Sequence, residues 1–361
     1  MAKFQFWLPT LDKITRIQKS AINSNEAAFV TGVPGTGKTV VSIYRLINAN
    51  NAILFTYGKL LRKTIEEKIA DRSKTIVNIH KWNYDLTSTY LEENLKDDNI
   101  KETINIFKSK GIKYDQIFVD EGQDLLPNSY KLFKGISNNL TVSADEAQTV
   151  TNRYESSDEM DILKILGDVK QYELDEIFRS SYELYNFARQ FVPYNARAND
   201  FNLLEKLQRD NSGARKPFVY VLDELSLSYE KMSDIIDDNI TDNIGILCED
   251  TITVDDCTKN LENDYEVSTY HSKLSKEQQN KVLNNDLKSI IITTIRSAKG
   301  IEFDVVIMPQ FQHAKPEKAE QYFVGATRAK SELHLICIQN TPPMLTTFDE
   351  NSYKIIKERR R

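Results

Sequence analysis

The sequence has few cysteines and no long apolar segment. Its three cysteines, at positions 248, 257 and 337, form no CxxC pair and give no disulfide framework, so we expect inert thiols in a reducing compartment. The N-terminal MAKFQFWLPT lacks the apolar stretch and the cleavage site of a signal peptide. No apolar run reaches the roughly 18 residues that a membrane-spanning helix needs. These absences predict a cytoplasmic protein without a membrane partner.

There is also no excess of positive charge. The net charge is −6, which excludes a chain coated with basic residues for nucleic acid. An acidic enzyme can still hold a strand in a local basic groove, so net charge does not decide the partner. Hydrophobic residues make up 40% and charged residues 28%, which is ordinary for a globular protein. A length of 361 residues favours two domains.

What the sequence does contain is an alternation of short β-branched segments with amphipathic segments of helical length. Segments such as IFVD, SIIITT and DVVIM are apolar on both faces, which is typical of parallel strands covered by helices. The pattern predicts an α/β fold with parallel sheets. The predicted strands are 27–31, 52–56, 75–79, 116–120 and 140–144, then 218–222, 244–248, 266–269, 289–294, 305–308 and 333–338.

Two domains are predicted, residues 1–167 and 168–361, with the boundary near Gly167. Each is expected to carry a small helical insertion, at about 82–110 in the first and about 182–216 in the second. The basic C-terminal segment KIIKERRR is predicted to be a frayed, solvated helix end, with a phosphate contact as the disfavoured alternative.

Residues 32–39, GVPGTGKT, match the phosphate-binding pattern G-x-x-x-x-G-K-[ST] in full. The pattern follows a predicted strand and opens a predicted helix, which disfavours the alternative of a glycine turn with a stray lysine. Gly35 and Gly37 let the backbone turn its N–H groups toward phosphate oxygens, and the helix N-terminus adds a favourable dipole. We predict an ATP site in which Lys38 neutralises the β- and γ-phosphates and Thr39 binds Mg²⁺. The backbone of Thr36 belongs to the same loop.

Residues 117–124, IFVDEGQD, contain the two acidic residues expected at the same ATP site. A buried strand places Asp120 and Glu121 at its carboxyl end, where ligands bind in open α/β sheets. Asp120 suits Mg²⁺, and Glu121 can orient and deprotonate an attacking water. Two acids at a strand end are otherwise a solvated turn, but the P-loop upstream favours the catalytic interpretation.

DEGQD resembles the DExxD/DExxQ box of superfamily 1 helicases of the UvrD/Rep type. Further segments resemble that family's motifs in the family's order, from Gln18 to Lys330. They are TRIQKSA (the Q motif), FTYGKLLR (motif Ia), VNIHKW (the T-x-H element), SADEAQT (motif III), LDEIFRSS (motif IV), TIRSAKGIEFDVVI (motif V) and QYFVGATRAK (motif VI). The resemblance implies two RecA-like P-loop NTPase domains, with ATP in the cleft between them. Larger members of the family carry inserted domains in both halves, but the roughly thirty-five residues between the His80 element and Asp120 leave no room for one here, since a stable domain needs about fifty or more.

The resemblance also implies roles for single residues. Gln148 would sense the γ-phosphate, while Arg179 and Arg328 would supply positive charge to the transition state, in the manner of arginine fingers. The other implied nucleotide contacts are Gln18 on adenine, Phe178 stacked on the base, Gly300 and Glu302.

Candidates for contact with the strand follow from the same motifs. Trp82 either stacks on a base or belongs to the core, and the sequence leaves both interpretations open. Arg296 stands where motif V usually has histidine. The full set is Thr56, Lys59, His80, Trp82, Ser272, Lys273, Thr294 and Arg296.

The leading hypothesis is an ATP-dependent translocase or helicase on single-stranded nucleic acid, with DNA favoured and movement 3′ to 5′ implied by the resemblance. The second is an ATP-driven switch or loading subunit in a larger assembly, triggered by nucleic acid and without processive unwinding. A P-loop kinase is disfavoured by the paired acids and the late arginine motifs. A protein partner subunit or self-association fits either of the first two.

Overall fold

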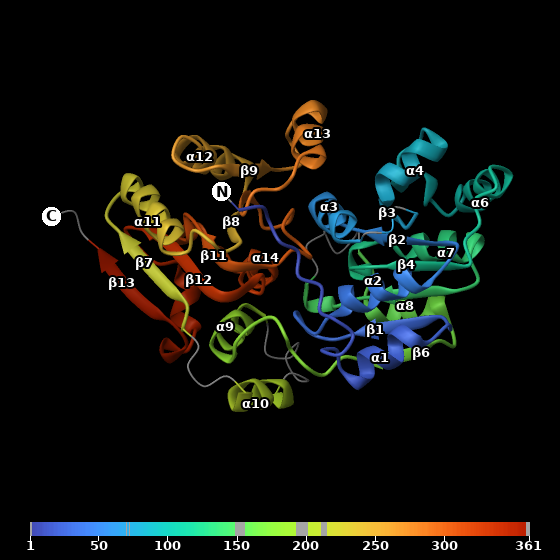
Figure 1. Cartoon of the computed structure of the whole chain (residues 1–361), viewed down its shortest axis with the longest axis horizontal. Helices are drawn as coiled ribbons and strands as arrows, with labels where there is room; N and C mark the ends of the chain where they lie inside the picture. Colours follow the sequence, from blue (N-terminus) through green and yellow to red (C-terminus); the bar gives the residue numbers. More distant parts are fainter. Residues whose placement is uncertain are drawn as a thin grey trace. The chain divides into compact units, whose positions relative to one another are not determined.

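The computed structural model describes residues 2–69, 71, 73–148, 156–192, 201–210 and 215–358. The chain forms two compact units (Figure 1). One is Trp7–Phe178, and the other is Met1–Phe6 together with Arg179–Arg361. The division therefore falls later than Gly167. The reason is β6 (Lys170–Glu173), which pairs in parallel with β1 (Ala28–Thr31) and extends the first sheet past that glycine.

The first unit is built on a six-stranded sheet in the order β3-β2-β4-β5-β1-β6, and every pairing in it is parallel. The remaining strands are β2 (Ala52–Thr56), β3 (Thr75–Asn78), β4 (Gln116–Val119) and β5 (Leu140–Ser143). Its helices are α1 (Arg16–Asn23), α2 (Lys38–Asn48), α3 (Lys59–Lys68), α4 (Ile79–Thr87), α5 (Leu91–Asn94), α6 (Ile100–Ser109), α7 (Pro127–Ile136) and α8 (Glu159–Leu166).

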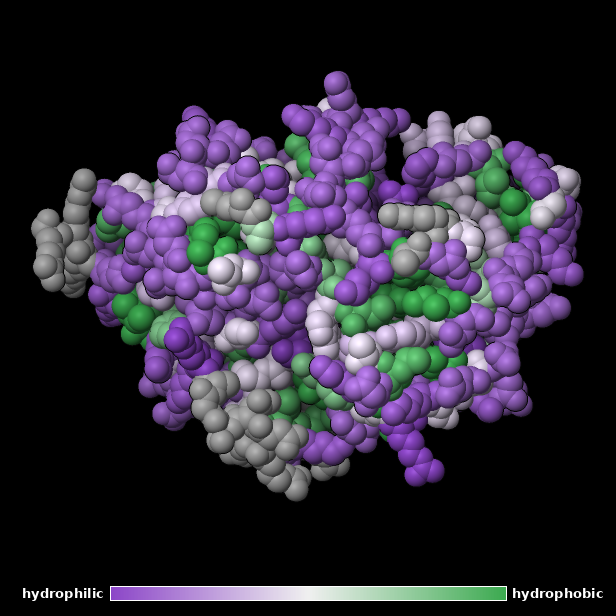
Figure 2. Space-filling view, viewed as in Figure 1, coloured by the Kyte–Doolittle hydropathy of each residue, from purple (hydrophilic) through white to green (hydrophobic). Residues whose placement is uncertain are grey.

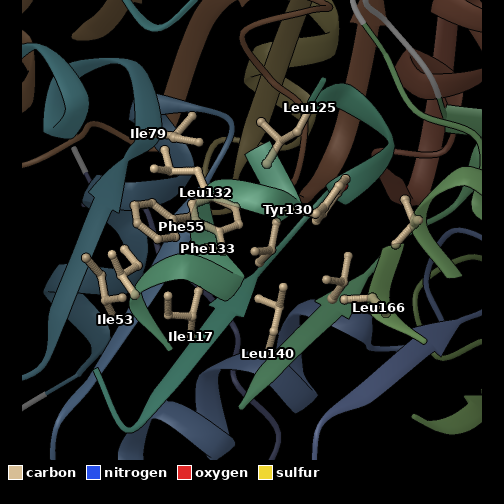
Figure 3. Packing of buried hydrophobic residues seen from close by; sticks show 14 of the residues in the cluster. Ile53, Phe55, Ile79, Ile117, Leu125, Tyr130, Leu132, Phe133, Leu140 and Leu166 are labelled. Atoms are coloured by element: carbon tan, nitrogen blue, oxygen red, sulfur yellow. The ribbon is translucent and has the colours of Figure 1, made fainter. Parts of the chain in front are cut away.

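The predicted insertion at 82–110 is the segment that forms α4, α5 and α6, and it packs on the core of the first unit. In that core the rings of Phe55 and Phe133 stack with their centroids 4.7 Å apart (Figure 3). Trp82 lies edge-on to Phe55 at 5.0 Å and to Phe107 of α6 at 4.9 Å, and only 8% of it is exposed. Trp82 therefore belongs to the core, which is one of the two interpretations that the sequence left open.

The second unit has a seven-stranded sheet in the order β13-β7-β12-β11-β8-β10-β9, again with parallel pairings. Its strands are β7 (Phe218–Leu222), β8 (Ile244–Cys248), β9 (Val267–Tyr270), β10 (Ile290–Thr294), β11 (Phe303–Met308), β12 (Ala329–Ile338) and β13 (Lys354–Glu358). Its helices are α9 (Tyr182–Ala188), α10 (Phe201–Asp210), α11 (Leu225–Asp238), α12 (Thr251–Leu261), α13 (Lys276–Asn284) and α14 (Ala319–Ala326).

The prediction of a helix end for KIIKERRR is wrong over residues 354–358, which form the edge strand β13 on β7. The two β-branched residues explain the difference, because Ile356 packs against the core of the second unit while Ile355 faces outward. Arg359 and the two residues after it lie outside the described residues. Within the described part of the chain, no helix has the length and apolar character needed to cross a membrane.

Candidate nucleotide-binding and catalytic site

Three neighbouring strands of the first sheet bring the predicted nucleotide residues together. The order β4-β5-β1 is contiguous and parallel, so the carboxyl ends of these strands share one edge of the sheet. The P-loop follows β1, Asp120 and Glu121 follow β4, and the segment with Gln148 follows β5. Motifs separated by about a hundred residues therefore converge because of sheet order.

The P-loop has the backbone shape that its glycines were predicted to supply. Gly35 and Gly37 have φ of 84° and 89°, and Gly37 is the N-cap of α2. A Cβ atom on Gly37 would lie 2.4 Å from Nε2 of Gln18. The backbone conformation therefore favours glycine at position 37, and any side chain there would also have to displace the Gln18 amide.

Lys38 is buried at the start of α2 and points back over the loop. Its Nζ donates to the carbonyl oxygens of Gly32 at 2.5 Å and Val33 at 3.3 Å, and it lies 3.3 Å from Oδ2 of Asp145. A lysine held over the loop, next to the N-terminus of a helix, suits a polyphosphate. The sequence motifs do not single out Asp145, although it lies two residues after a buried strand, close to the equivalent of the position that identified Asp120.

Thr39 and Asp120 form the arrangement expected of a magnesium site. The Thr39 hydroxyl donates to Oδ2 of Asp120 at 2.9 Å, and Asp120 is buried. A hydroxyl and a carboxylate in contact are the hard oxygen ligands that Mg²⁺ takes beside a phosphate. The residues therefore fit a Mg²⁺–nucleotide, whose metal would neutralise charge on the phosphates.

Glu121 is buried and has a left-handed backbone, with φ of 56°. Its Oε2 accepts a hydrogen bond from Nε2 of Gln123 at 2.7 Å. Gln148, the predicted γ-phosphate sensor, donates from Nε2 to Oδ2 of Asp145 at 2.6 Å. Asp145 thus contacts both the P-loop lysine and the sensor. A left-handed conformation at a non-glycine residue is strained and often marks a functional position.

Gln18 and Phe178 both bond to the P-loop, Gln18 through its side chain and Phe178 through its backbone N–H. Nε2 of Gln18 donates to the Thr36 carbonyl at 2.8 Å, and its Oε1 accepts from the Thr15 backbone at 2.8 Å. The buried Gln18 therefore supports the P-loop, and adenine recognition would use its second amide hydrogen. The backbone N–H of Phe178 donates to the Gly35 carbonyl at 2.9 Å, and its ring is 43% exposed, as a stacking residue requires.

The second unit holds the two predicted arginines around one glutamate. Nη2 of Arg179 pairs with Oε1 of Glu302 at 2.5 Å, and Nη1 donates to the Thr327 carbonyl at 3.2 Å. Arg328 is buried and donates from Nη2 to the Thr327 hydroxyl at 3.3 Å. Burial would raise the pKa of Glu302, but Arg179, Lys330 and Arg328 outweigh it and lower that pKa.

Glu302 was expected to contact the nucleotide, and the structure places it as the partner of Arg179. Gly300, two residues earlier, has a φ of 81° in the turn between β10 and β11. The acid therefore orients a predicted catalytic arginine within its own unit.

The predicted strand contacts gather at the carboxyl ends of neighbouring strands in each unit. Thr56 ends β2 and His80 follows β3, while Thr294 ends β10 and Ser272 follows β9. Both threonines are buried, with 2% and 9% exposed, so their hydroxyls offer little surface. The exposed members are His80, Ser272, Lys273 and Arg296, and Lys59 is half-buried. Hydrophilic side chains cover the neighbouring α13 (Figure 2).

Two α/β sheets, one of them carrying a P-loop beside paired acids, define the class of P-loop ATP hydrolases. A family model described as the UvrD-like helicase C-terminal domain matches residues 132–340, more than half of the chain, and an AAA domain model matches residues 16–172. The chain belongs to the UvrD-like helicase family, and the enzyme class is that of ATP-hydrolysing helicases.

Individual relatives cover the chain less fully. The RecBCD enzyme subunit RecB of Chlamydia pneumoniae is 39% identical over 67 residues, which are 17% of this chain and 6% of that protein. The C-terminal domain of a possible DNA helicase from Lactobacillus plantarum is 18% identical, with a TM-score of 0.37 over 49% of this chain and 98% of that one. The helicase of PRRSV is 13% identical, with a TM-score of 0.44 over 89% of this chain and 54% of that one.

Proposed function

We propose that this chain is an ATP-dependent translocase or helicase on single-stranded nucleic acid, with DNA favoured and movement 3′ to 5′. The observation that carries the proposal is the shared sheet edge of β4, β5 and β1. There Lys38 lies 3.3 Å from Asp145, Thr39 lies 2.9 Å from Asp120, and Glu121 is the adjacent buried acid. The preference for DNA and the direction rest on resemblance to the family.

In the proposed reaction, each residue of this edge has one task. Lys38 exchanges its loop carbonyls for phosphate oxygens, and Thr39 and Asp120 would hold Mg²⁺. A carboxylate oxygen of Glu121 orients the attacking water and accepts its proton, a contribution commonly worth about 10²–10⁴-fold in rate. Gln148 senses the terminal phosphate through its amide.

The arginines of the second unit complete the proposed reaction. Arg179 and Arg328 supply charge to the transition state when that unit closes on bound ATP. The strand-binding residues of the two units then alternate in affinity as ATP is bound and hydrolysed. This alternation turns hydrolysis into directional steps along a strand.

The test is ATP hydrolysis measured side by side with single-stranded DNA, duplex DNA and RNA. Single strands should stimulate the wild-type enzyme. Lys38→Ala should abolish turnover, and Glu121→Gln should bind ATP without hydrolysing it. Wild-type turnover by Glu121→Gln, or equal turnover with and without every nucleic acid, would contradict the proposal.

The second candidate is an ATP-driven switch or loading subunit. Two observations favour it: one matched relative is named as a subunit of a larger enzyme, and the segment between β3 and β4 is only the short helices α4 to α6. A strand-displacement assay separates the candidates, because a switch hydrolyses ATP in response to a strand but displaces none.

A further inference from the structure

Gln123 has no role in the reaction described above, yet it is fully buried beside the proposed catalytic base. It lies in the short 3-10 turn η1 (Gly122–Asp124) that follows Glu121. Several bonds fix this turn. The Tyr130 hydroxyl donates to the Gly122 carbonyl, Leu125 N donates to the same oxygen at 3.0 Å, and Ser157 N donates to the Gln123 carbonyl at 3.0 Å. The backbone from which the Gln123 side chain extends is therefore held in place.

The Gln123 amide joins two segments that are separate in the sequence. Its Oε1 accepts from the backbone N–H of Asp145 at 3.0 Å, and its Nε2 donates to Oε2 of Glu121 at 2.7 Å. Chemistry fixes the orientation of the amide, because a backbone N–H only donates and an ionised carboxylate only accepts. The same Asp145 contacts Lys38 and Gln148 through its carboxylate. One side chain thus connects Glu121 to the residue that touches both the P-loop lysine and the phosphate sensor.

We propose that Gln123 is a positioning residue that couples the state of the Asp145–Gln148 segment to the orientation of the Glu121 carboxylate. This inference rests on the proposed function, since it takes Glu121 as the base. When Lys38 moves to a phosphate, Asp145 loses a cation and its segment can shift. Its backbone N–H bonds to the Gln123 amide, so the shift reaches the carboxylate that orients water.

Two substitutions separate positioning from simple packing. Gln123→Met keeps a side chain of similar length and removes both hydrogen bonds. Gln123→Glu keeps the acceptor for Asp145 but replaces the donor to Glu121 with a second carboxylate. Both variants should bind ATP with wild-type affinity, lower kcat by about tenfold or more and show reduced stimulation by a single strand, because an oriented base commonly contributes roughly 10²–10⁴-fold.

A split between ATP affinity and kcat is the readout that loss of packing does not give. In both variants the Kd for ATP should stay at its wild-type value while kcat and strand stimulation fall, because only the orientation of the Glu121 carboxylate changes. Leu132→Ala, a cavity variant in the core of the same unit, is the stability control. It should lower the melting temperature while the folded enzyme keeps wild-type kcat and strand stimulation.

Glu121→Gln is assayed in parallel to separate the two proposals. Wild-type kcat and strand stimulation in folded Gln123→Met would overturn the coupling role while an inactive Glu121→Gln upheld the proposed base. If Gln123→Met does not fold, wild-type kcat and strand stimulation in folded Gln123→Glu overturn it equally. Wild-type hydrolysis by Glu121→Gln would instead remove the proposed function itself.

Discussion

The side chains assigned to ATP are already bonded to protein groups. Lys38 contacts two loop carbonyls and Asp145, and Thr39 donates to Asp120. A buried charge without a partner is costly, so phosphate and metal must exchange with these partners. Binding and hydrolysis should therefore respond to different substitutions. We expect substitutions in the P-loop unit to change ATP binding, and substitutions of the arginines in the other unit to change the rate of hydrolysis.

Arg328→Ala should lower kcat far more than it raises KM for ATP. An arginine that acts only in the transition state contributes roughly 10³–10⁵-fold in related nucleotide hydrolases, and uniform binding effects would appear in KM alone. Arg328→Lys should also be slow, because an ammonium lacks the planar fork. Steady-state kinetics on protein shown to be folded tests this.

The control is Arg215→Ala, which removes a largely exposed arginine paired with Glu332 in the same unit. A raised KM with unchanged kcat would assign Arg328 to ground-state binding.

Glu302 should make the stability of the second unit depend on acid pH. Despite burial, its arginine and lysine neighbours lower its pKa, so folding favours the charged form. That contribution is fully present above the unfolded-state value of about 4.3 and is lost as pH falls through the lower folded-state pKa. Unfolding experiments from about pH 6 to pH 3 should show wild type more stable than Glu302→Gln at the upper end, with the gap closing below pH 4. A gap that widens on acidification would contradict this sign. Glu230→Gln on the surface of α11 is the control.

At the level of elements, the glycine at the junction of β1 and α2 can be compared with a matched glycine that follows α6. Gly37 and Gly111 both have left-handed backbones, with φ of 89° and 72°. A Cβ on Gly37 meets Gln18 at 2.4 Å, whereas one on Gly111 meets nothing within 4 Å. Both alanine variants should lose about 1–2 kcal/mol from backbone strain. Gly37→Ala alone should also weaken ATP binding, because the Cβ displaces the Gln18 amide that supports the loop. Calorimetric titration with ATP decides this, and normal affinity in Gly37→Ala would show that the loop tolerates a side chain.

The apolar pattern predicted the covered strands but not two edge strands. Lys170–Glu173 is polar and mostly exposed, and Lys354–Glu358 buries one face only in part, so neither shows the two-sided apolar pattern of a central parallel strand. Pairing with β1 and β7 stabilises them instead, and such pairing depends on the whole sheet. This is also why the boundary was placed at Gly167.

Within the site, motif spacing identified residues by chemical type but not by their partners. Lys38, Thr39 and Asp120 follow from local patterns, and the structure brings them to one sheet edge. The roles of Asp145 and Gln123 depend on β5 lying between β4 and β1, an order that the sequence does not state. Side-chain contacts between residues that follow different strands depend on the strand order of the sheet. They could therefore be identified only from the structure.

For the whole molecule, stimulation of ATP hydrolysis by a single strand should weaken as salt is added. The chain is acidic overall, with a net charge of −6, so strand affinity must come from local cations such as Lys273 and Arg296. Each phosphate neutralised contributes a slope of about −0.7 in log affinity against log salt for single strands. Titrations of ATPase stimulation at several salt concentrations measure this slope. Lys273→Ala should make it shallower, with Lys357→Ala on β13 as the control. A slope near zero would mean that the trigger is not a nucleic-acid backbone.

The chain should be a better strand-stimulated ATPase than a duplex-separating helicase. Larger UvrD-like enzymes, by the resemblance described above, carry inserted domains in both halves that assist duplex engagement. Here the described residues between β3 and β4 are α4 to α6, which pack on the core of the first unit, and those between α9 and β10 supply strands and helices of the second. Under the proposed function, stepping should need only the two units, so we expect ATP hydrolysis to be retained. Strand separation should in addition need contacts with the duplex ahead.

We therefore expect slow displacement from a tailed duplex of a few tens of base pairs, under conditions where the tail alone stimulates hydrolysis fully. A shorter duplex that melts readily serves as the positive control, and Glu121→Gln as the negative one. A partner subunit or self-association would supply the missing grip, so displacement should rise with protein concentration or with an added partner while ATP turnover per chain stays constant. Rapid, processive unwinding at concentrations where the chain is monomeric would contradict this expectation and show that the compact units themselves hold the duplex.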